Sequence, residues 1–207
     1  MGGPTMPHNT LDGLREEHRE LHGLLTILER QLLSTHDGGS PDFEVMAELL
    51  DYLGDEPERH HHPLEARLLE RLGERAPHLA NAAAALNRER GRVVTAGRKL
   101  QRMVSEVLDG LMVPRQRLTR LGLRYVHGYQ ALIAREETAV FPALEQHLRT
   151  RDWLELVTAC HWHCGLTEVN PERSEYAVLR RRIVHEAGGL WPVGVDAAQR
   201  CPVCDGH

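Results

Sequence analysis

The segment from residue 79 to residue 111 carries small and apolar residues at helical spacing, and this regularity constrains the fold more than any other feature of the chain. The positions recur every three or four residues, which is the period of one face of an α-helix. A helix of this length with one apolar face needs other helices to cover that face. Arg90 is the charged exception, so a guanidinium is expected at a core position. The face consists of Leu79, Ala83, Leu86, Arg90, Val93, Gly97, Leu100, Val104, Val107 and Leu111.

Three further segments show the same spacing and predict three further helices. The first is expected over about residues 10–33, the second over about 42–73, and the last from residue 114 onwards. Pro57 and Pro63 predict a kink or an interruption within the second helix, because each removes a backbone donor.

Four amphipathic helices with short connections indicate an all-α fold, an up-down-up-down four-helix bundle over residues 10–150. Residues 151–207 are expected to form a C-terminal extension. The first helix turns Leu14, His18, Leu21, Leu25, Leu28 and Leu32 inward, and the last helix turns Leu118, Leu121, Tyr125, Leu132, Glu136, Val140 and Ala143 inward.

Composition and charge exclude several classes of protein. The chain has 207 residues, enough for one domain with a full core and an appendage. Its net charge of -5 predicts no attraction to nucleic acid or to an anionic membrane surface. No apolar run is long enough to span a bilayer, and the first ten residues lack the features of a signal peptide. We therefore expect a cytoplasmic protein.

Four ionisable side chains at inward positions predict a metal site: His18, His61, Glu65 and Glu136. His61 and Glu65 stand four residues apart, one above the other on a helix. Buried ionisable groups must be paired or must bind a cation. Two imidazoles with carboxylates suit iron, manganese or zinc and leave open coordination positions. The alternative is a metal-free core in which these groups bond to one another.

The remaining histidines of the bundle are expected outside this site. The phase of the apolar faces puts His22, His60 and His62 on a flank or on the surface. His62 is a fallback ligand, because it stands three residues before Glu65 and a kink at Pro63 is expected. His127 is excluded, since it lies about half a turn out of phase with Glu136.

The extension contains all four cysteines of the chain, and their spacing predicts a zinc site. They are Cys160 and Cys164, then the Cys-x-x-Cys pair Cys201 and Cys204, and His163 can replace one of them. Two alternatives remain: four reduced cysteines, or a redox-active disulfide in the second pair. The extension could also bind a protein partner.

Three segments resemble the hemerythrin-like (HHE cation-binding) family. They are residues 14–19, residues 61–65, which read His-His-Pro-Leu-Glu, and residues 135–142. Residues 151–154 and 176–183 are also similar to segments that follow the bundle in many members. The resemblance extends over about residues 10–186.

This resemblance implies a four-helix bundle with a non-haem di-iron centre, used for oxygen binding or sensing, for handling peroxide or nitric oxide, or for iron sensing. By position, His18, His61 and Glu65 match the first half of that centre, and Glu136 matches the second. The other two histidines of the second half are replaced by Arg90 and Leu132. We therefore expect a reduced site, with the Arg90 guanidinium reaching Glu136.

Three hypotheses for function follow from these patterns. The first is a metal-binding protein that binds or senses O2, NO or peroxide at non-haem iron. The second is a metal-dependent oxidase or oxygenase acting on a small molecule. The third is a metal-free interaction module with a tail held by zinc.

Overall fold

The structure is a computed structural model that describes residues 7–59 and 61–156, and all regular secondary structure in this part of the chain is helical. Residues 150–156 are also helical. The predicted all-α class is confirmed. The elements are α1 (Pro7–His36), α2 (Phe43–Arg59), α3 (His61–Arg75), the 3₁₀ turn η1 (Pro77–Leu79), α4 (Ala80–Leu108), α5 (Arg115–Arg135), the π turn η2 (Glu136–Val140) and α6 (Phe141–His147).

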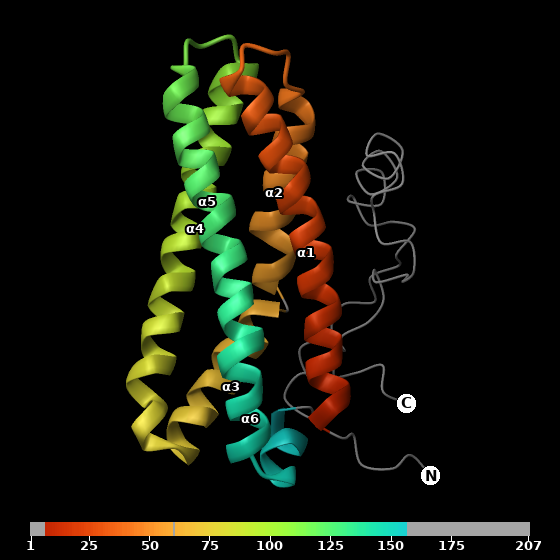
Figure 1. Cartoon of the computed structure of the whole chain (residues 1–207), viewed down its shortest axis with the longest axis vertical. Coiled ribbons are helices and arrows are strands. Elements are labelled where there is room, and N and C mark those ends of the chain that lie inside the picture. The colour runs from red at the N-terminus through yellow and green to blue at the C-terminus, as the bar shows by residue number, and fades with distance from the viewer. Residues whose placement is uncertain (1–6, 60, 157–207) are drawn as a thin grey trace.

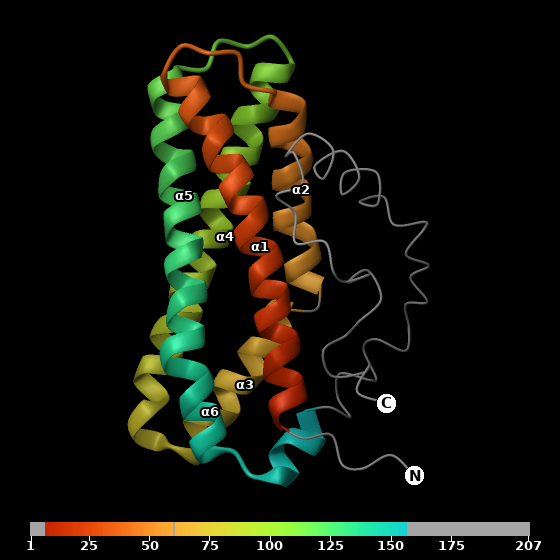
Figure 2. The ribbon, with the colours of Figure 1, turned by 45° about the vertical axis from the view of Figure 1, so that its right-hand side comes forward.

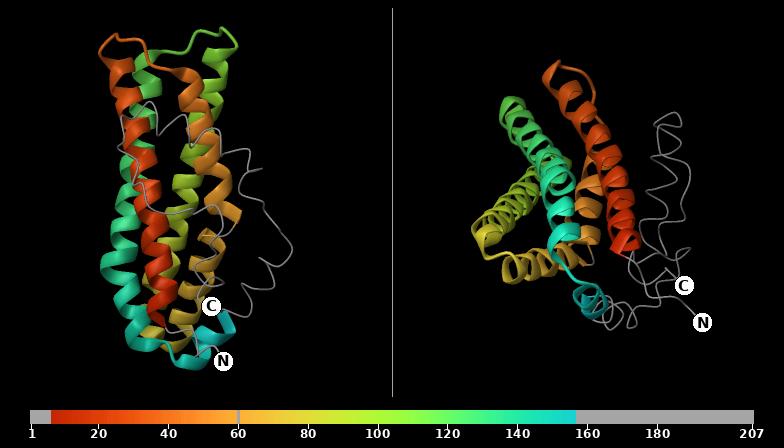
Figure 3. Two further views of the ribbon diagram at one scale, coloured as in Figure 1. Left: turned by 90° about the vertical axis from the view of Figure 1, so that its right-hand side faces the viewer. Right: turned by 60° about the horizontal axis from the view of Figure 1, so that its bottom comes forward.

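The long helices lie side by side along the longest axis of the molecule (Figure 1). Helix α1 packs on α5, α5 packs on α4, and α4 packs on both α2 and α3. The connections 37–42 and 109–114 lie at one end of the assembly, and η1 and α6 lie at the other (Figures 1 and 2). Helix α3 follows α2 but leans towards the start of α4 (Figure 3).

The expected interruption of the second helix is confirmed, because α2 ends at Arg59 and α3 begins at His61. Pro63 is the third residue of α3. A proline is tolerated in the first turn of a helix, where the backbone N–H groups have no partner within the helix. The chain therefore starts a new helix at this point, with a new direction and a new phase.

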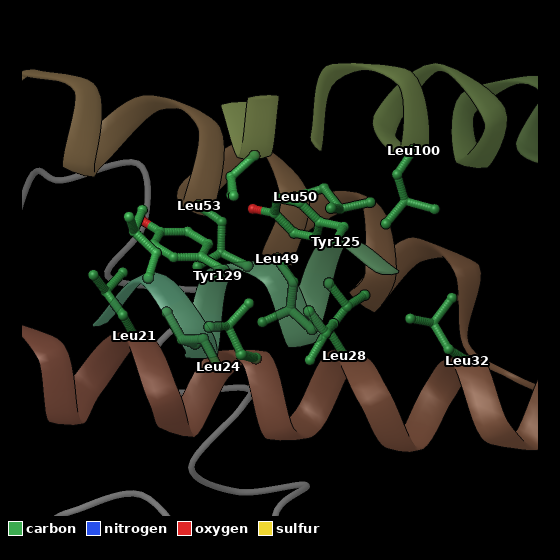
Figure 4. Close-up of a cluster of buried hydrophobic side chains, with 14 of the residues drawn as sticks. Leu21, Leu24, Leu28, Leu32, Leu49, Leu50, Leu53, Leu100, Tyr125 and Tyr129 are labelled. Atoms are coloured by element: carbon green, nitrogen blue, oxygen red, sulfur yellow. The ribbon is translucent and has the colours of Figure 1, made fainter. Parts of the chain in front are cut away.

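The apolar core consists of two clusters. The larger one lies between α1, α2, α4 and α5, and Figure 4 shows leucines of α1 facing Tyr125 and Tyr129 of α5. The smaller cluster lies at the end near α6, where Trp153 is 2% exposed. The smaller cluster contains Leu11, Leu14, Leu64, Leu68, Leu72, Ala76, Phe141, Leu144, Leu148, Trp153 and Leu156.

Two details of the expected helices are wrong. Leu111 is 60% exposed, because α4 ends at Leu108 and the chain turns at Gly110, whose φ is 79°. The inward face of the last helix does not continue through Val140 and Ala143. Phe141 and Leu144 are buried instead, because the π turn adds one residue to the helix and shifts every later residue by one position.

Within the residues that the structure describes, no helix combines the length and the apolar character needed to cross a membrane.

Candidate metal centre

A layer of buried polar side chains separates the two apolar clusters. It is formed by His18 of α1, His61 and Glu65 of α3, Arg90 of α4 and Glu136 of η2. The exposed fraction of these residues runs from 1% for His18 to 6% for Arg90. The layer follows from the helical spacing, because the charged residues occupy positions between apolar ones on each inward face.

Two imidazoles and one carboxylate of this layer converge. The Nε2 atoms of His18 and His61 are 3.1 Å apart, and each lies 3.3 Å from Oε1 of Glu65. One ligand atom from each of the three residues lies within 4.8 Å of the others. Two imidazole nitrogens at this separation need a proton or a cation between them. This group is therefore the candidate metal site.

The other ring nitrogen of each histidine meets a carboxylate. Nδ1 of His18 lies 2.9 Å from Oε1 of Glu137, and Nδ1 of His61 lies 2.6 Å from Oε2 of Glu17. An Nδ1–H that donates to a carboxylate leaves Nε2 with its lone pair, which is the form that binds a metal. Both lone pairs then face the carboxylate of Glu65. Phe141 stacks on His18 with 7° between the ring planes and fixes the orientation of that imidazole.

Arg90 contacts two of the buried carboxylates. Its Nη2 donates to Oε1 of Glu136 at 2.5 Å and lies 2.9 Å from Oε2 of Glu65. Its Nη1 donates to Oδ1 of Asn87 at 2.8 Å. The predicted contact between Arg90 and Glu136 is confirmed, whereas the contact with Glu65 was not predicted. Glu136 lies farther from the histidines, with its Oε2 at 3.7 Å from His18 Nε2.

The charges of the layer depend on one another. Burial lowers the pKa of His61, but the carboxylates of Glu65 and Glu17 outweigh burial and raise it well above its usual value. Burial raises the pKa of Glu65, yet His61, His18 and Arg90 bring it well below its usual value. Burial and the Glu65 charge raise the pKa of Glu136 to about 8, against the opposing effect of Arg90. Glu65 is therefore the carboxylate of the layer that stays charged most readily.

The remaining histidines divide between surface and core. His22 and His127 are exposed, as expected, and His127 pairs with Glu29 on the outside of the bundle. The expectation that His62 lies on a flank or on the surface is wrong. It is 7% exposed, and its Nε2 lies 3.1 Å from the hydroxyl of Tyr129. The new phase of α3 turns His62 inward, although it is not part of the converging group.

Several predicted site residues lie outside the described part of the chain. They are His60, His163, Cys160, Cys164, Cys201 and Cys204. Zinc binding by the cysteines therefore stays a prediction.

Sequence reasoning missed the two outer carboxylates, Glu17 and Glu137. Each is next in the chain to a residue of the layer, His18 or Glu136. Neighbours on a helix point about 100° apart, so the inward phase did not select them. The doubled acidic residues at 16–17 and 136–137 are the signal that could have found them.

The donor set fits one metal ion. Two Nε2 atoms and Glu65 Oε1 suit a first-row transition metal. Oε2 of Glu65 is buried and faces the Arg90 guanidinium at 2.9 Å, so Oε1 is the oxygen that remains directed at the two imidazoles.

The sequence itself points to the same chemistry. The family model of the hemerythrin HHE cation binding domain matches residues 9–144, more than half of the chain. No curated protein and no solved structure matches the chain. The matched segment contains the whole buried polar layer, from His18 to Glu136. The chain therefore belongs to the hemerythrin HHE cation-binding domain family.

Proposed function

We propose that this protein holds a non-haem iron ion between His18, His61 and Glu65 and uses it to bind or sense a small ligand such as O2, NO or peroxide. The observation that carries the proposal is the convergence of two Nε2 atoms and a carboxylate oxygen in a buried layer. The carboxylates behind the two Nδ1 atoms support it, because they orient both imidazoles as ligands.

Iron bound by two histidines and one carboxylate keeps open coordination positions, at which a diatomic ligand or peroxide can bind. The protein supplies the rest. His18 and His61 hold their lone pairs inward, and Glu65 contributes a negative charge. The apolar clusters on either side exclude water from the layer. Arg90 places the positive charge of its guanidinium beside Glu65.

We further propose that the domain is an up-down-up-down four-helix bundle in which α2 and α3 together form the second helix. The alternating ends of the connections 37–42, 76–79 and 109–114 support this topology. It places one residue of the layer on each of α1, α4 and η2, and two on α3.

Metal analysis of the purified full chain and its variants tests the iron site. We expect iron in the parent protein and its loss in His61→Ala and in Glu65→Ala, because each removes a converging ligand atom. His127→Ala is the matched control, since this exposed histidine also pairs with a glutamate but lies outside the layer. Equal iron in all four proteins, or equal loss in all three variants, would refute the assignment.

Binding or sensing is favoured here over turnover of an organic substrate, because Arg90 and its carboxylate partners fill the part of the layer beside the histidines. An oxidase or oxygenase acting on a small molecule is the alternative that oxygen-dependent product formation would reveal. A parent protein that contains no metal would instead favour the interaction module. The cytoplasmic location stays a prediction.

A further inference from the structure

We propose that the Arg90 guanidinium takes the place of a second metal ion, so that the bundle holds at most one. The di-iron centre expected from the family does not fit the residues of this chain. Glu65 and Glu136 converge on a guanidinium nitrogen of Arg90. The number of bound ions rests on the proposed function, because it presupposes that the bundle binds iron. The role of Arg90 as a buried cation does not depend on that function.

Charge balance is the first step. Glu65 and Glu136 are 3% and 2% exposed, so water does not solvate a charge on either carboxylate. The single nitrogen Nη2 of Arg90 lies 2.5 Å from Glu136 and 2.9 Å from Glu65. A buried carboxylate is stable when it is paired with a cation or protonated, and here the guanidinium supplies the cation without any metal.

The chemistry of the second half of the layer is the next step. Position 90 holds an arginine and position 132 a leucine, and neither side chain is a metal ligand. Leu132 is 1% exposed and belongs to the large apolar cluster. A second ion would therefore find carboxylates alone as ligands. It would also stand beside the positive charge of the Arg90 guanidinium.

Arg90 is held in this position. Its Nη1 donates to Asn87 one turn earlier on α4, and only 6% of the residue is exposed. An outward rotation of the side chain would remove the guanidinium from Glu65 and Glu136 at once and leave both buried groups with the histidines alone. The guanidinium is thus a permanent part of the layer.

A double-mutant cycle in metal-free protein tests the role of Arg90 as the buried cation. Arg90→Met keeps an unbranched apolar stem and removes the charged guanidinium. We expect it to raise the unfolding equilibrium constant at least tenfold, and we expect Glu136→Gln in the same background to recover part of this loss. Arg92→Met, at an exposed arginine on the same helix, should change the constant less than threefold. Should Arg90→Met not fold, Arg90→Lys, which retains the charge, is expected to fold, and this contrast replaces the cycle as the test of the charge.

Metal stoichiometry tests the second part of the proposal. The parent protein titrated with Fe²⁺ is expected to bind one ion per chain. Arg90→His combined with Leu132→His is expected to bind two, because it supplies two imidazoles beside the carboxylates. Arg92→His should bind one.

The outcomes separate this inference from the proposed function. Two ions in the parent would overturn the role of Arg90 while leaving iron binding intact. A different result would be a parent protein that binds no ion, together with the expected double-mutant cycle and one ion gained by the double-histidine variant. This result would refute the proposed function and support the role of Arg90 as the buried cation. Equal effects of Arg90→Met and Arg92→Met, with no coupling to Glu136, would overturn the inference. So would a folded double-histidine variant that binds no more iron than the parent.

Discussion

Each imidazole of the candidate centre is held at both ring nitrogens, and this distinguishes the pair from a chance meeting of histidines in a core. The outer contacts come from Glu17 on the first helix and Glu137 on the π turn. Both carboxylates are partly exposed, at 28% and 37% of their side chains. The imidazoles that they contact, those of His61 and His18, are buried. The effect of the two carboxylates should fall on the orientation and basicity of the ligands.

We expect Glu17→Ala and Glu137→Ala each to weaken metal binding by roughly 10–100-fold. Titration with Fe²⁺ under anaerobic conditions measures the affinity. Glu29→Ala is a matched control, because Glu29 also accepts from a histidine and its side chain is equally exposed, at 28%. Unchanged affinity in both test variants would mean that these carboxylates do not orient the ligands.

The π turn is the element that brings two consecutive glutamates to one imidazole. The amide of Phe141 donates to the carbonyl of Glu136, five residues earlier. Glu136 approaches Nε2 of His18, and Glu137 contacts its Nδ1. In a regular α-helix the side chains of two consecutive residues would point further apart around the helix axis. Five residues, rather than four, separate the buried Glu136 from the buried Phe141.

Deletion of Thr138, an exposed residue of the π turn, should convert that turn into α-helix. Phe141, the next core residue, would then follow Glu136 at the α-helical spacing of four residues instead of five. We therefore expect a folded protein that retains its helix content. Glu137 would turn away from His18, and metal affinity should fall about tenfold or more. Circular dichroism and Fe²⁺ titration measure the two effects. Thr138→Ala keeps the chain length and should bind metal normally; full affinity in the deletion variant would contradict the role given to the π turn.

At the scale of the whole molecule, the end of the bundle below the polar layer depends on residues 149–156. Trp153 and Leu156 complete the smaller apolar cluster. Asp152 has no exposed surface and accepts from Arg71 and Arg75 of α3. This segment therefore supports the helix that carries His61 and Glu65. The segment also leads directly into the cysteine-containing extension.

The Asp152 contacts predict an acid-dependent loss of stability. The hydrogen bonds from Arg75 hold the pKa of Asp152 below its usual value. A group with a lowered folded-state pKa adds stability above its unfolded pKa and loses it as the pH falls through the folded value. Asp152→Asn should therefore lower the free energy of unfolding by about 1–3 kcal/mol at pH 7. As the pH falls below about 4, the difference in stability between the variant and the parent should shrink to zero. Urea denaturation from pH 7 to pH 2 measures it. Asp109→Asn, in the exposed connection, is the control and should have the same free energy of unfolding as the parent at each pH. An Asp152→Asn variant that also matches the parent would refute the role of the contacts between Asp152 and the two arginines.

The helices could be predicted from the sequence because their apolar spacing is a local property of each segment. The inward face of α1, from Leu14 to Leu32, is buried as expected. The break beside the histidines was foreseen from Pro57 and Pro63, which act on the backbone locally. The burial of Phe141 and Leu144 was not foreseen. A π turn changes the phase by one residue, and only the packing of the helix on both sides of it selects that geometry.

The sequence by itself determined which residues enter the polar layer, since helical phase alone directs His18, His61, Glu65, Arg90 and Glu136 inward. The tertiary structure decided how these residues pair. Arg90 bridges Glu65 as well as Glu136, and the two imidazoles face each other with carboxylates behind them. The physical reason is that phase specifies the direction of a side chain from its own helix. The distances between side chains on different helices depend on how those helices lean, begin and change phase.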